Sequence, residues 1–341
     1  MTSIYSCIIG SDKLWLSIYK NKIMDNLPSN IRNLEKETFF NISQSKSPNT
    51  IRAYKSDFAD FAVFCKSNNL KSMPSDVKSL TIYLTFLFKK KQKFSTIKRK
   101  LISISQVHKI KGYYIDVKNP LIIENLLGIK RQLGADQKGK KPLSIDHLRQ
   151  IIEKIDEEKI SELKKIRDKA IILLGFAGGF RRSELTNLDV EDVEFVDEGL
   201  KIILKKSKTD PFGKGLIKAI PFFENVKFCP VKNLKLWLEK SCINKGKIFC
   251  RLTKSNNIFF KKITDQSIAK LIKHYLNRIG VQNKNFSAHS LRSGFATATA
   301  EAGADERSIM NMTGHKSVQM VRRYIKETNL FKNNPLKKIN L

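Results

Sequence analysis

The spacing of apolar residues constrains the fold of this chain most, because helical spacing runs through nearly the whole sequence. Alternating, strand-like spacing is confined to residues 193–221, where the turns Asp197-Glu198-Gly199 and Asp210-Pro211-Phe212-Gly213 separate short segments. The expected strands cover residues 193–196, 200–206 and 216–221. The sequence therefore predicts a mainly α-helical protein with a small antiparallel β-sheet, which places it in the α+β class.

Two domains are expected from the length of the chain and from a change in its pattern. The chain has 341 residues, whereas single hydrophobic cores stop growing near about 250–300 residues. Residues 132–141 read Q-L-G-A-D-Q-K-G-K-K, a polar composition with two glycines that is typical of an exposed linker. We expect an uncertain N-terminal extension at 1–40, a helical domain at 41–134, a linker at 135–142, a second domain at 143–328 and a C-terminal tail at 329–341.

The first domain is expected to be a small bundle of four or five helices. One helix begins at the start signal Pro48-Asn49-Thr50, and others lie near residues 75–90, 95–111 and 120–133. In the second domain, helices are expected near residues 144–157, 162–178, 231–240, 265–279, 289–302, 305–312 and 318–328. Gly303 and Gly314 stand where helix C-caps are expected.

The net charge of the chain indicates a polyanionic partner. There are 64 Lys and Arg against 32 Asp and Glu, a formal net charge of +32. An AT-rich genome explains part of the lysine excess, and an anionic membrane surface is the alternative partner. However, no apolar run approaches the roughly 20 residues that a membrane-spanning helix needs, and the N-terminus does not resemble a signal peptide. Five cysteines without a CxxC pair are typical of reduced thiols, so a cytoplasmic location is expected.

Several common phosphate chemistries have no residues to carry them. The sequence contains no GxxxxGK[ST] loop and no HExxH motif. The neighbouring acids Asp168, Glu184, Asp189 and Asp192 stand mostly at expected helix ends and turns, where acids commonly act as caps. We therefore expect no metal site and no cofactor. A phosphate site without metal requires cationic side chains, above all arginine, which can bind two oxygens at once.

The C-terminal region contains such residues at regular spacing. His289 and Arg292 are three residues apart and share a face if this segment is helical. His315 follows the expected cap Gly314, and Tyr324 lies nine residues further on, within a basic segment. Each of these residues alone is more often structural, because a lone tyrosine is usually a packed aromatic residue. Their order and spacing make a phosphate-handling site the stronger interpretation.

From about residue 48 to residue 326 the sequence resembles the tyrosine recombinase, or phage-type integrase, family. Residues 179–185, G-F-R-R-S-E-L, are similar to the family's G-L-R-x-S-E-L box, with Phe180 in place of the usual leucine. Residues 289–292 match H-x-L-R, and residues 314–315 match the G-H box. Ser207-Lys208-Thr209-Asp210 resembles the segment that holds the catalytic lysine, and residues 50–54, T-I-R-A-Y, look like the opening of the family's helical domain.

The resemblance implies a role for each matching residue. Tyr324 would be the nucleophile, Arg181 and Arg292 would bind the phosphate oxygens, and Lys208 would protonate the leaving oxygen. His289 and His315 can donate hydrogen bonds to the phosphate, and His289 can take the tyrosine proton. Glu184 would orient an active-site group. DNA-binding residues are expected in the helical domain, which the family implies is a core-binding, SAM-like domain: Thr50, Arg52, Lys98, Arg99 and Lys100.

The lysine is the least certain of these assignments. Lys205, Lys206 and Lys208 are crowded at one strand end, and Lys214 lies across the turn. Because side chains alternate faces on a strand, Lys206 and Lys208 point the same way and Lys205 the opposite way. A register slip of one residue would change the assignment.

The implied function is site-specific cleavage and rejoining of double-stranded DNA through a 3′-phosphotyrosyl intermediate, without metal or ATP. A mobile genetic element is one expected setting, and the sequence leaves integration, excision, inversion and resolution of chromosome dimers open. A homotetramer on two DNA sites is expected. Leu330, Phe331 and Leu336 in the tail are equally consistent with a segment that packs on a neighbour and with a frayed end. A type IB topoisomerase and a catalytically silent DNA-binding remnant remain alternatives. The T-I-R-A-Y opening favours a recombinase over the first, and the filled catalytic positions disfavour the second.

Overall fold

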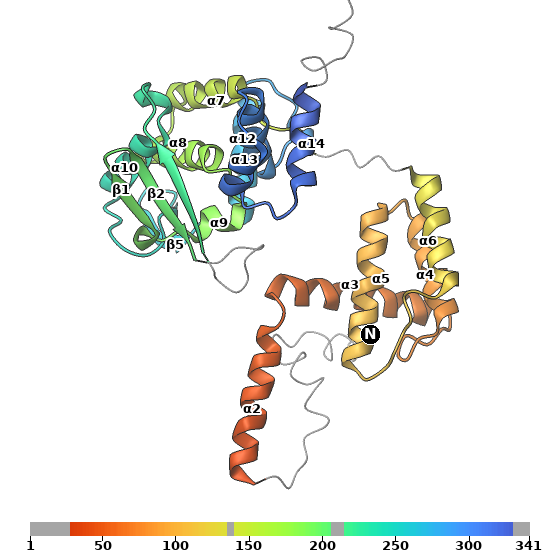
Figure 1. Cartoon of the computed structure of the whole chain (residues 1–341). Coiled ribbons are helices and arrows are strands. Elements are labelled where there is room, and N and C mark those ends of the chain that lie inside the picture. The colour runs from red at the N-terminus through yellow and green to blue at the C-terminus, as the bar shows by residue number, and fades with distance from the viewer. Residues whose placement is uncertain (1–27, 135–139, 206–214, 330–341) are drawn as a thin grey trace, which may run out of the picture. The chain divides into compact units, whose positions relative to one another are not determined.

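A computed structural model of the chain describes residues 28–134, 140–205 and 215–329. The chain divides into two compact units, Met1–Gln137 and Lys138–Leu341. Both are built mainly from helices, and the second also contains antiparallel strands (Figure 1). The predicted fold class is confirmed. None of the helices in the described ranges is long and apolar enough to span a membrane.

The first unit contains five described helices. They are α2 (Ser29–Gln44), α3 (Pro48–Ser67), α4 (Val77–Lys89), α5 (Phe94–Ile110) and α6 (Pro120–Leu133). Helix α3 begins where the sequence predicts, because the Ser47 side chain accepts a hydrogen bond from the Thr50 backbone and Pro48 occupies the first turn. The sequence did not reveal α2, which crosses residue 40. Its apolar residues Ile31, Leu34 and Phe40 are exposed, so among its described side chains no buried apolar stripe anchors the helix to a core.

The core of the first unit lies between α3, α4, α5 and α6. Phe61, Leu80, Tyr83 and Ile97 are fully buried there, and the ring centroids of Phe61 and Tyr83 are 5.0 Å apart. Helix α3 contacts α5, and α4 contacts α6. This packing fixes the face of α5 that carries the expected DNA-binding cations.

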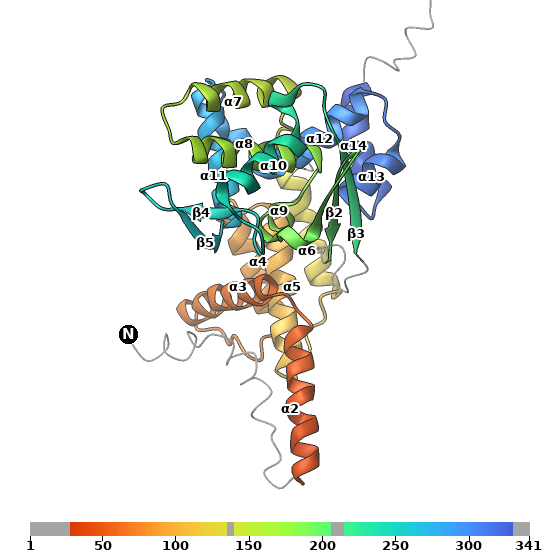
Figure 2. The same cartoon turned by 90° about the vertical axis from the view of Figure 1, so that its left-hand side faces the viewer.

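The second unit surrounds the buried helix α8. Its helices are α7 (Ile145–Glu157), α8 (Glu162–Ala177), α9 (Arg182–Asn187), α10 (Pro230–Ser241), α11 (Asp265–Arg278), α12 (His289–Glu301), α13 (Glu306–Thr313) and α14 (Val318–Asn329). Helix α8 is buried almost continuously from Ala170 to Gly175 and packs against α7, α10 and α12 (Figure 2). Such an apolar central helix gives the surrounding elements one shared core.

A three-stranded antiparallel sheet covers one side of this unit. Its strands β1 (Val193–Val196), β2 (Gly199–Leu204) and β3 (Leu216–Pro221) follow the chain order, with Val193 opposite Ile202 and Leu200 opposite Ile220. Leu200, Ile202 and Leu204 are buried, whereas Lys201 and Ile203 are exposed. The sheet therefore has one core face, and side chains at even positions of β2 and β3 point to it.

A second hairpin, β4 (Cys250–Leu252) and β5 (Ile258–Lys262), was missing from the sequence prediction. Phe259 and Phe260 on β5 are adjacent and both exposed, so β5 shows no alternation of apolar and polar residues. Its position is set by its pairing with β4 across the loop at 253–257, and the apolar pattern of β5 itself does not reveal that partner.

Helix α12 lies unusually close to the chain segment that leads into α7. A Cβ atom on Gly294 would lie 2.2 Å from the Leu143 carbonyl oxygen, closer than any real side chain can approach. The Leu143 backbone N–H also donates to the Ser290 carbonyl over 2.9 Å. The start of the second unit is thus fixed against the helix that carries His289 and Arg292.

Candidate active site

Glu184 holds Arg181 in place through one hydrogen bond to its side chain and one to its backbone. Arg181 immediately precedes α9, and its Nη1 atom donates to Glu184 Oε1 over 2.5 Å, while its backbone N–H donates to Glu184 Oε2 over 2.9 Å. Its Nη2 atom donates to the Gly314 carbonyl over 3.2 Å. Glu184 is buried, so this ion pair is shielded from water. The guanidinium direction is therefore fixed before any ligand binds.

Arg292 is a buried cation with an unused donor. The residue is only 1% exposed, and its Nη1 atom donates to the Gly179 carbonyl over 2.9 Å. Its Nη2 atom has no hydrogen-bond partner within the described residues. Burial, together with the neighbouring charge of Arg181, lowers the pKa of Arg292 to about 10. A buried, unpaired donor on a cation is costly, and an anion bound beside it would satisfy it.

His315 lies beside Tyr324 in the same region. Gly314 ends α13 in the left-handed conformation, with φ of 63°, and the chain turns there to bring in His315. The ring centroids of His315 and Tyr324 are 6.3 Å apart, with 35° between the planes. Burial, and then the charges of Arg292 and Arg181, lower the pKa of His315 to about 3. The imidazole is therefore neutral at pH 7.

Tyr324 is carried by α14, which packs against α12 and α13. The side chain is half-buried and packs against a small cluster that includes Ala296, Ile309 and Val321. Its hydroxyl influences the pKa of Arg292 electrostatically, which places the two groups in one region. The contacts of the ring thus orient the side chain without burying it completely.

His289 occupies the first position of α12, where its backbone N–H donates to Ser287 Oγ over 3.2 Å. The residue is exposed, unlike His315. Loss of solvent around part of the ring, and then the charges of Arg292, Arg181 and Arg182, lower the pKa of His289. The structure thus brings Arg181, His289, Arg292, His315 and Tyr324 together from four separate segments.

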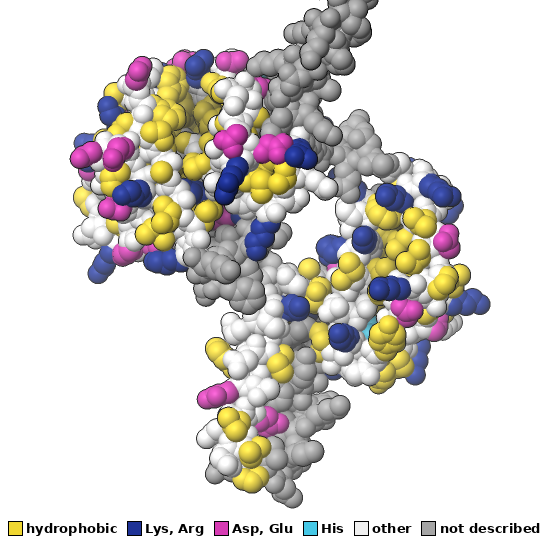
Figure 3. Space-filling model, viewed as in Figure 1, with side chains coloured by type: hydrophobic (Ala, Val, Ile, Leu, Met, Phe, Trp, Pro, Cys, Tyr) yellow, Lys and Arg dark blue, Asp and Glu magenta, His cyan; other side chains and the backbone are white. Residues whose placement is uncertain are grey.

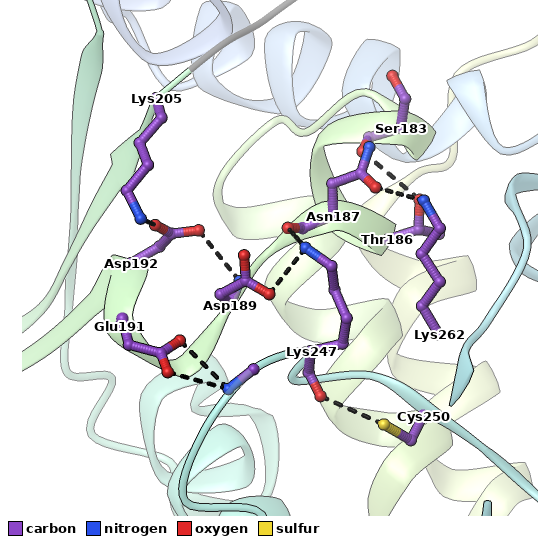
Figure 4. A network of polar contacts seen from close by, with 11 residues as sticks. Ser183, Thr186, Asn187, Asp189, Glu191, Asp192, Lys205, Lys247, Cys250 and Lys262 are labelled. Carbon is purple, nitrogen blue, oxygen red and sulfur yellow. Dashed lines mark hydrogen bonds and ion pairs between the residues drawn. The ribbon is translucent and has the colours of Figure 1, made fainter. Parts of the chain in front are cut away.

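Lys208, the expected catalytic lysine, lies outside the described residues, as does Lys206. Lys205, at the end of β2, forms an ion pair with Asp192 over 2.5 Å (Figure 4). The pKa of Lys205 is raised by this hydrogen bond to the carboxylate. Lys205 is therefore engaged away from the cluster formed by the other site residues.

Lys218 on β3 is a buried cation that the sequence analysis missed. Its exposure is 0%, and its Nζ atom donates to the Gly178 carbonyl over 2.5 Å and also to the Met312 carbonyl. The same atom lies 4.6 Å from the centroid of the Phe180 ring. Burial lowers the pKa of Lys218 to about 7. The signal was present, because residue 218 alternates with the apolar residues Leu216 and Ile220 on the core face of β3.

The cations Arg181, Lys218 and Arg292 connect two distant sequence boxes through backbone carbonyls. Lys218 donates to the Gly178 carbonyl, directly before the box at 179–185, and Arg292 donates to the carbonyl of Gly179, the first residue of that box. Lys218 and Arg181 bind carbonyls on either side of Thr313, directly before His315. These contacts explain how segments more than 100 residues apart in sequence form one site.

The acids that could have suggested a metal site have other partners. Asp189 pairs with Lys247 over 2.7 Å, and both carboxylate oxygens of Glu191 accept from the Gly246 backbone N–H, over 3.0 and 3.2 Å (Figure 4). Asp168 pairs with Arg167 over 2.8 Å. Within the described ranges, no three His, Cys, Asp or Glu residues are arranged to bind a metal ion. The network instead fixes the segment after α9.

The expected DNA-binding residues of the first unit differ in their surroundings. Arg99 and Lys100 form ion pairs with Asp57 and Asp60 of α3, whereas Lys98 is exposed. Thr50 belongs to the N-terminal cap of α3, with its Oγ1 2.9 Å from Ser47 Oγ, and Arg52 donates to Asn49 over 2.5 Å on an exposed surface. Lys and Arg side chains are distributed over the visible face of this unit (Figure 3).

Comparison with known sequences gives matches over most of the chain. Residues 141–330 match the phage integrase family. The chain is 36% identical over 301 residues to an integrase/recombinase xerD homolog of Selenomonas ruminantium, with 87% of each sequence covered. It is 28% identical over 304 residues to the tyrosine recombinase XerC of Syntrophus aciditrophicus strain SB, covering 85% of this chain and 91% of that protein.

Comparison with solved structures supports the same fold. The XerH site-specific recombinase, in a post-cleavage complex with palindromic difH substrate, matches with a TM-score of 0.61 and 19% identity, covering 89% of this chain and 82% of that chain. A lambda integrase(75-356) dimer bound to a COC′ core site matches with a TM-score of 0.54 and 16% identity, covering 86% and 93%. At these identities the likeness concerns the fold alone.

Proposed function

The chain belongs to the phage integrase family, and from that membership we propose that Tyr324 cuts and rejoins DNA strands beside Arg181 and Arg292. The family makes the protein a site-specific tyrosine recombinase. The observation that carries the residue assignment is the unpaired Nη2 atom of the buried Arg292, close to the charge of Arg181. A phosphodiester oxygen is the anion that a recombinase would place there.

In the proposed reaction, Arg181 and Arg292 bind the non-bridging oxygens of the scissile phosphate. Both guanidinium groups are oriented beforehand, by Glu184 and by the Gly179 carbonyl. They therefore stabilise the charge that develops in the transition state without having to reorganise. Glu184 acts by holding Arg181.

The Tyr324 oxygen forms a bond to phosphorus, and the bond between phosphorus and the 5′ oxygen breaks. The tyrosine proton passes to a histidine, His289 or His315, because a phenol of ordinary pKa near 10 attacks poorly while protonated. Lys208, identified by its sequence position, would protonate the departing 5′ oxygen. The 3′-phosphotyrosyl ester retains the energy of the original phosphodiester, so rejoining needs neither ATP nor a metal ion.

A nicked suicide substrate, which loses its short 5′ strand after cleavage, tests the nucleophile. The wild-type protein should accumulate a covalent DNA adduct, and Tyr324→Phe should bind the same DNA in a gel shift without forming one. An adduct from Tyr324→Phe would place the nucleophile elsewhere. If the wild-type protein binds the DNA but forms no adduct, the result would favour the alternative of a catalytically silent DNA-binding protein.

The same preparation separates a recombinase from a topoisomerase. A plasmid with paired target sites should yield recombinant products, and a supercoiled plasmid without such sites should stay supercoiled. Efficient relaxation of the second plasmid without products from the first would support a topoisomerase-like activity.

We further propose that the active form is a homotetramer on two double-stranded DNA sites. The solved relatives include recombinases bound to DNA, among them the lambda integrase dimer. An apolar groove of about 710 Å³ between α7, α8, β3 and α12, lined by Phe176, Ile220 and Phe295 among others, could receive residues 329–341 of a neighbouring copy. Deleting those residues should reduce the tetramer fraction measured by light scattering of the protein–DNA complex, and an unchanged fraction would place the contact elsewhere.

A further inference from the structure

Helix α14, which carries Tyr324, makes few apolar contacts through its described side chains. Of these side chains, Val321 alone is fully buried, and it packs against small residues of α12 and against Ile309 of α13. Val318 and Met320, earlier on the same helix, are exposed. A polar contact between α14 and its neighbours can therefore decide how firmly the helix is docked.

An ion pair joins α14 to the start of α13. The Arg322 Nε atom donates to both carboxylate oxygens of Glu306, over 3.0 and 3.1 Å, although the two residues are 16 positions apart in sequence. Glu306 is the first residue of α13, where the helix dipole favours an acidic side chain. The Asp305 side chain caps the same helix end by accepting from the backbone N–H groups of Arg307 and Ser308. The backbone that carries the Glu306 carboxylate is therefore fixed.

The ion pair lies on a different side of α14 from the buried contact. Val321 and Tyr324 are three positions apart, so they share the face of α14 that packs on its neighbours. Arg322 follows Val321 directly and points away from that face. The ion pair therefore restrains rotation of α14 about its own axis, in addition to its separation from α13. Because Tyr324 projects from the same helix, such a rotation would displace its hydroxyl.

We propose that Glu306 is a positioning residue that acts through Arg322 to hold α14, and with it Tyr324, in place beside the phosphate site. This inference rests on the proposed role of Tyr324 as the nucleophile. It concerns how the nucleophile is presented, and neither charged side chain takes part in the bond changes. The Arg322 side chain is 59% exposed and that of Glu306 is 36% exposed, so the contribution of the pair is small and is screened by salt.

A direct contact with a DNA phosphate is the other role that Arg322 can have. In that case Glu306 would compete with the DNA for Arg322, and removing the acidic charge would strengthen DNA binding. A positioning role predicts instead that loss of either partner slows cleavage equally and changes DNA affinity little. The two partners therefore have to be compared in the same assay.

Single-turnover adduct formation on the nicked suicide substrate, at saturating DNA, measures how well the nucleophile is presented. Glu306→Gln and Arg322→Gln should each slow this step by about two- to fivefold, the range expected for an exposed ion pair. The double variant should be no slower than either single variant, because the interaction can be lost only once. Arg307→Gln is the matched control, since it removes the same charge as Arg322→Gln from an exposed neighbouring residue, and it should keep the wild-type rate.

Exchange of the two charges tests whether the pair itself matters. Glu306→Arg places two cations together and should slow adduct formation more than Glu306→Gln does. Combining Glu306→Arg with Arg322→Glu restores opposite charges and should recover most of the loss, although an arginine at the start of α13 is opposed by the helix dipole. A combined variant as slow as Glu306→Arg would mean that this pair does not hold α14, and the proposal would fail.

Hydrogen exchange of the full-length protein without DNA tests the docking of α14 independently of any cleavage. Backbone amides of residues 318–326 should exchange about two- to fivefold faster in Glu306→Gln than in the wild type, and those of residues 289–301 in α12 should not change. Equal exchange of residues 318–326 would overturn the inference, whatever the fate of Tyr324→Phe. If the wild type formed no adduct but Glu306→Gln still loosened α14, the proposed function would fail and the docking role of Glu306 would stand.

Two further outcomes would overturn the proposal. Tighter DNA binding by Glu306→Gln and weaker binding by Arg322→Gln, both with an unchanged rate at saturating DNA, would assign Arg322 to the DNA. A lower urea midpoint in both variants, with the rate and the exchange of residues 318–326 as in the wild type, would mean that the pair contributes to stability alone.

Discussion

At the scale of single residues, Arg292 is anchored by one nitrogen of its guanidinium group and can bind a ligand with another. It donates to the Gly179 carbonyl with one nitrogen and leaves another without a partner in the described structure. Arg292→Ala should reduce the single-turnover cleavage rate by about 100- to 1000-fold, as loss of one preorganised donor does elsewhere. Arg292→Lys should recover little of it, because an ammonium group cannot make the paired contact of a guanidinium. A rate for Arg292→Ala within tenfold of wild type would remove Arg292 from the phosphate site.

His315 should make the stability of the DNA-free protein depend on pH. Its pKa is lowered to about 3 in the folded protein, against about 6.5 in an unfolded chain. Between these pH values the unfolded chain binds a proton at His315 and the folded protein does not. The free energy of unfolding therefore decreases as pH falls below about 6.5, by up to about 1.4 kcal/mol per pH unit. Urea unfolding at pH 7, 6 and 5 should show a smaller loss in His315→Gln. Equal losses would mean that His315 titrates normally.

The residues of the site differ in how far the sequence could reveal them. Arg181, His289, Arg292, His315 and Tyr324 stand in boxes with recognisable spacing, and the structure brings them together. Lys218 is an ordinary residue type on an expected strand, and its partners at Gly178 and Met312 are backbone carbonyls, which every residue has. Its contacts depend on tertiary distances that no local pattern contains.

At the scale of elements, β3 carries a lysine where its neighbours on the same face are apolar. The pKa of Lys218 is about 7 when folded, against about 10.4 when unfolded. The unfolded chain therefore holds a proton between these values that the folded protein has lost, so stability should rise with pH from about 7 toward 10, by up to about 1.4 kcal/mol per unit. Urea midpoints at pH 7, 8 and 9 should rise in the wild type and stay flatter in Lys218→Met. Parallel curves would contradict a neutral Lys218.

Elements with a buried stripe and a clear cap were predictable, whereas those defined by pairing or exposure were not. Helix α6 spans Pro120–Leu133 as expected, because Asn119 caps it and Pro120 opens it. Helix α10 (Pro230–Ser241) begins one residue before and ends one residue after the expected range. The described apolar residues of α2 are mostly exposed, the exposed Phe259 and Phe260 of β5 do not alternate with polar residues, and α9 is only six residues long.

At the scale of the whole molecule, the charge of +32 should make DNA binding strongly dependent on salt. The two basic residues at adjacent positions of α5 give a matched comparison, because Lys98 is exposed and Arg99 is paired with Asp57. Lys98→Gln should lower the slope of log affinity against log salt by about one, as expected for one lost phosphate contact. Arg99→Gln should change it less. Both slopes can be measured by fluorescence anisotropy between about 50 and 200 mM salt, roughly the range over which such contacts weaken. A larger change of slope in Arg99→Gln than in Lys98→Gln would mean that DNA displaces Asp57 from Arg99.

Lys218 also bears on how this protein would respond to laboratory evolution. A buried amine that must give up its proton is a weak point in the free energy of folding, so selection for heat resistance alone should replace it early with methionine or leucine. The two carbonyls at Gly178 and Met312 would then lose the group that joins them. Variants enriched for thermal tolerance should therefore be assayed for strand exchange at every round. The substitution of Lys218 that raises the melting temperature most would also remove the link between the segments that carry Arg181 and His315.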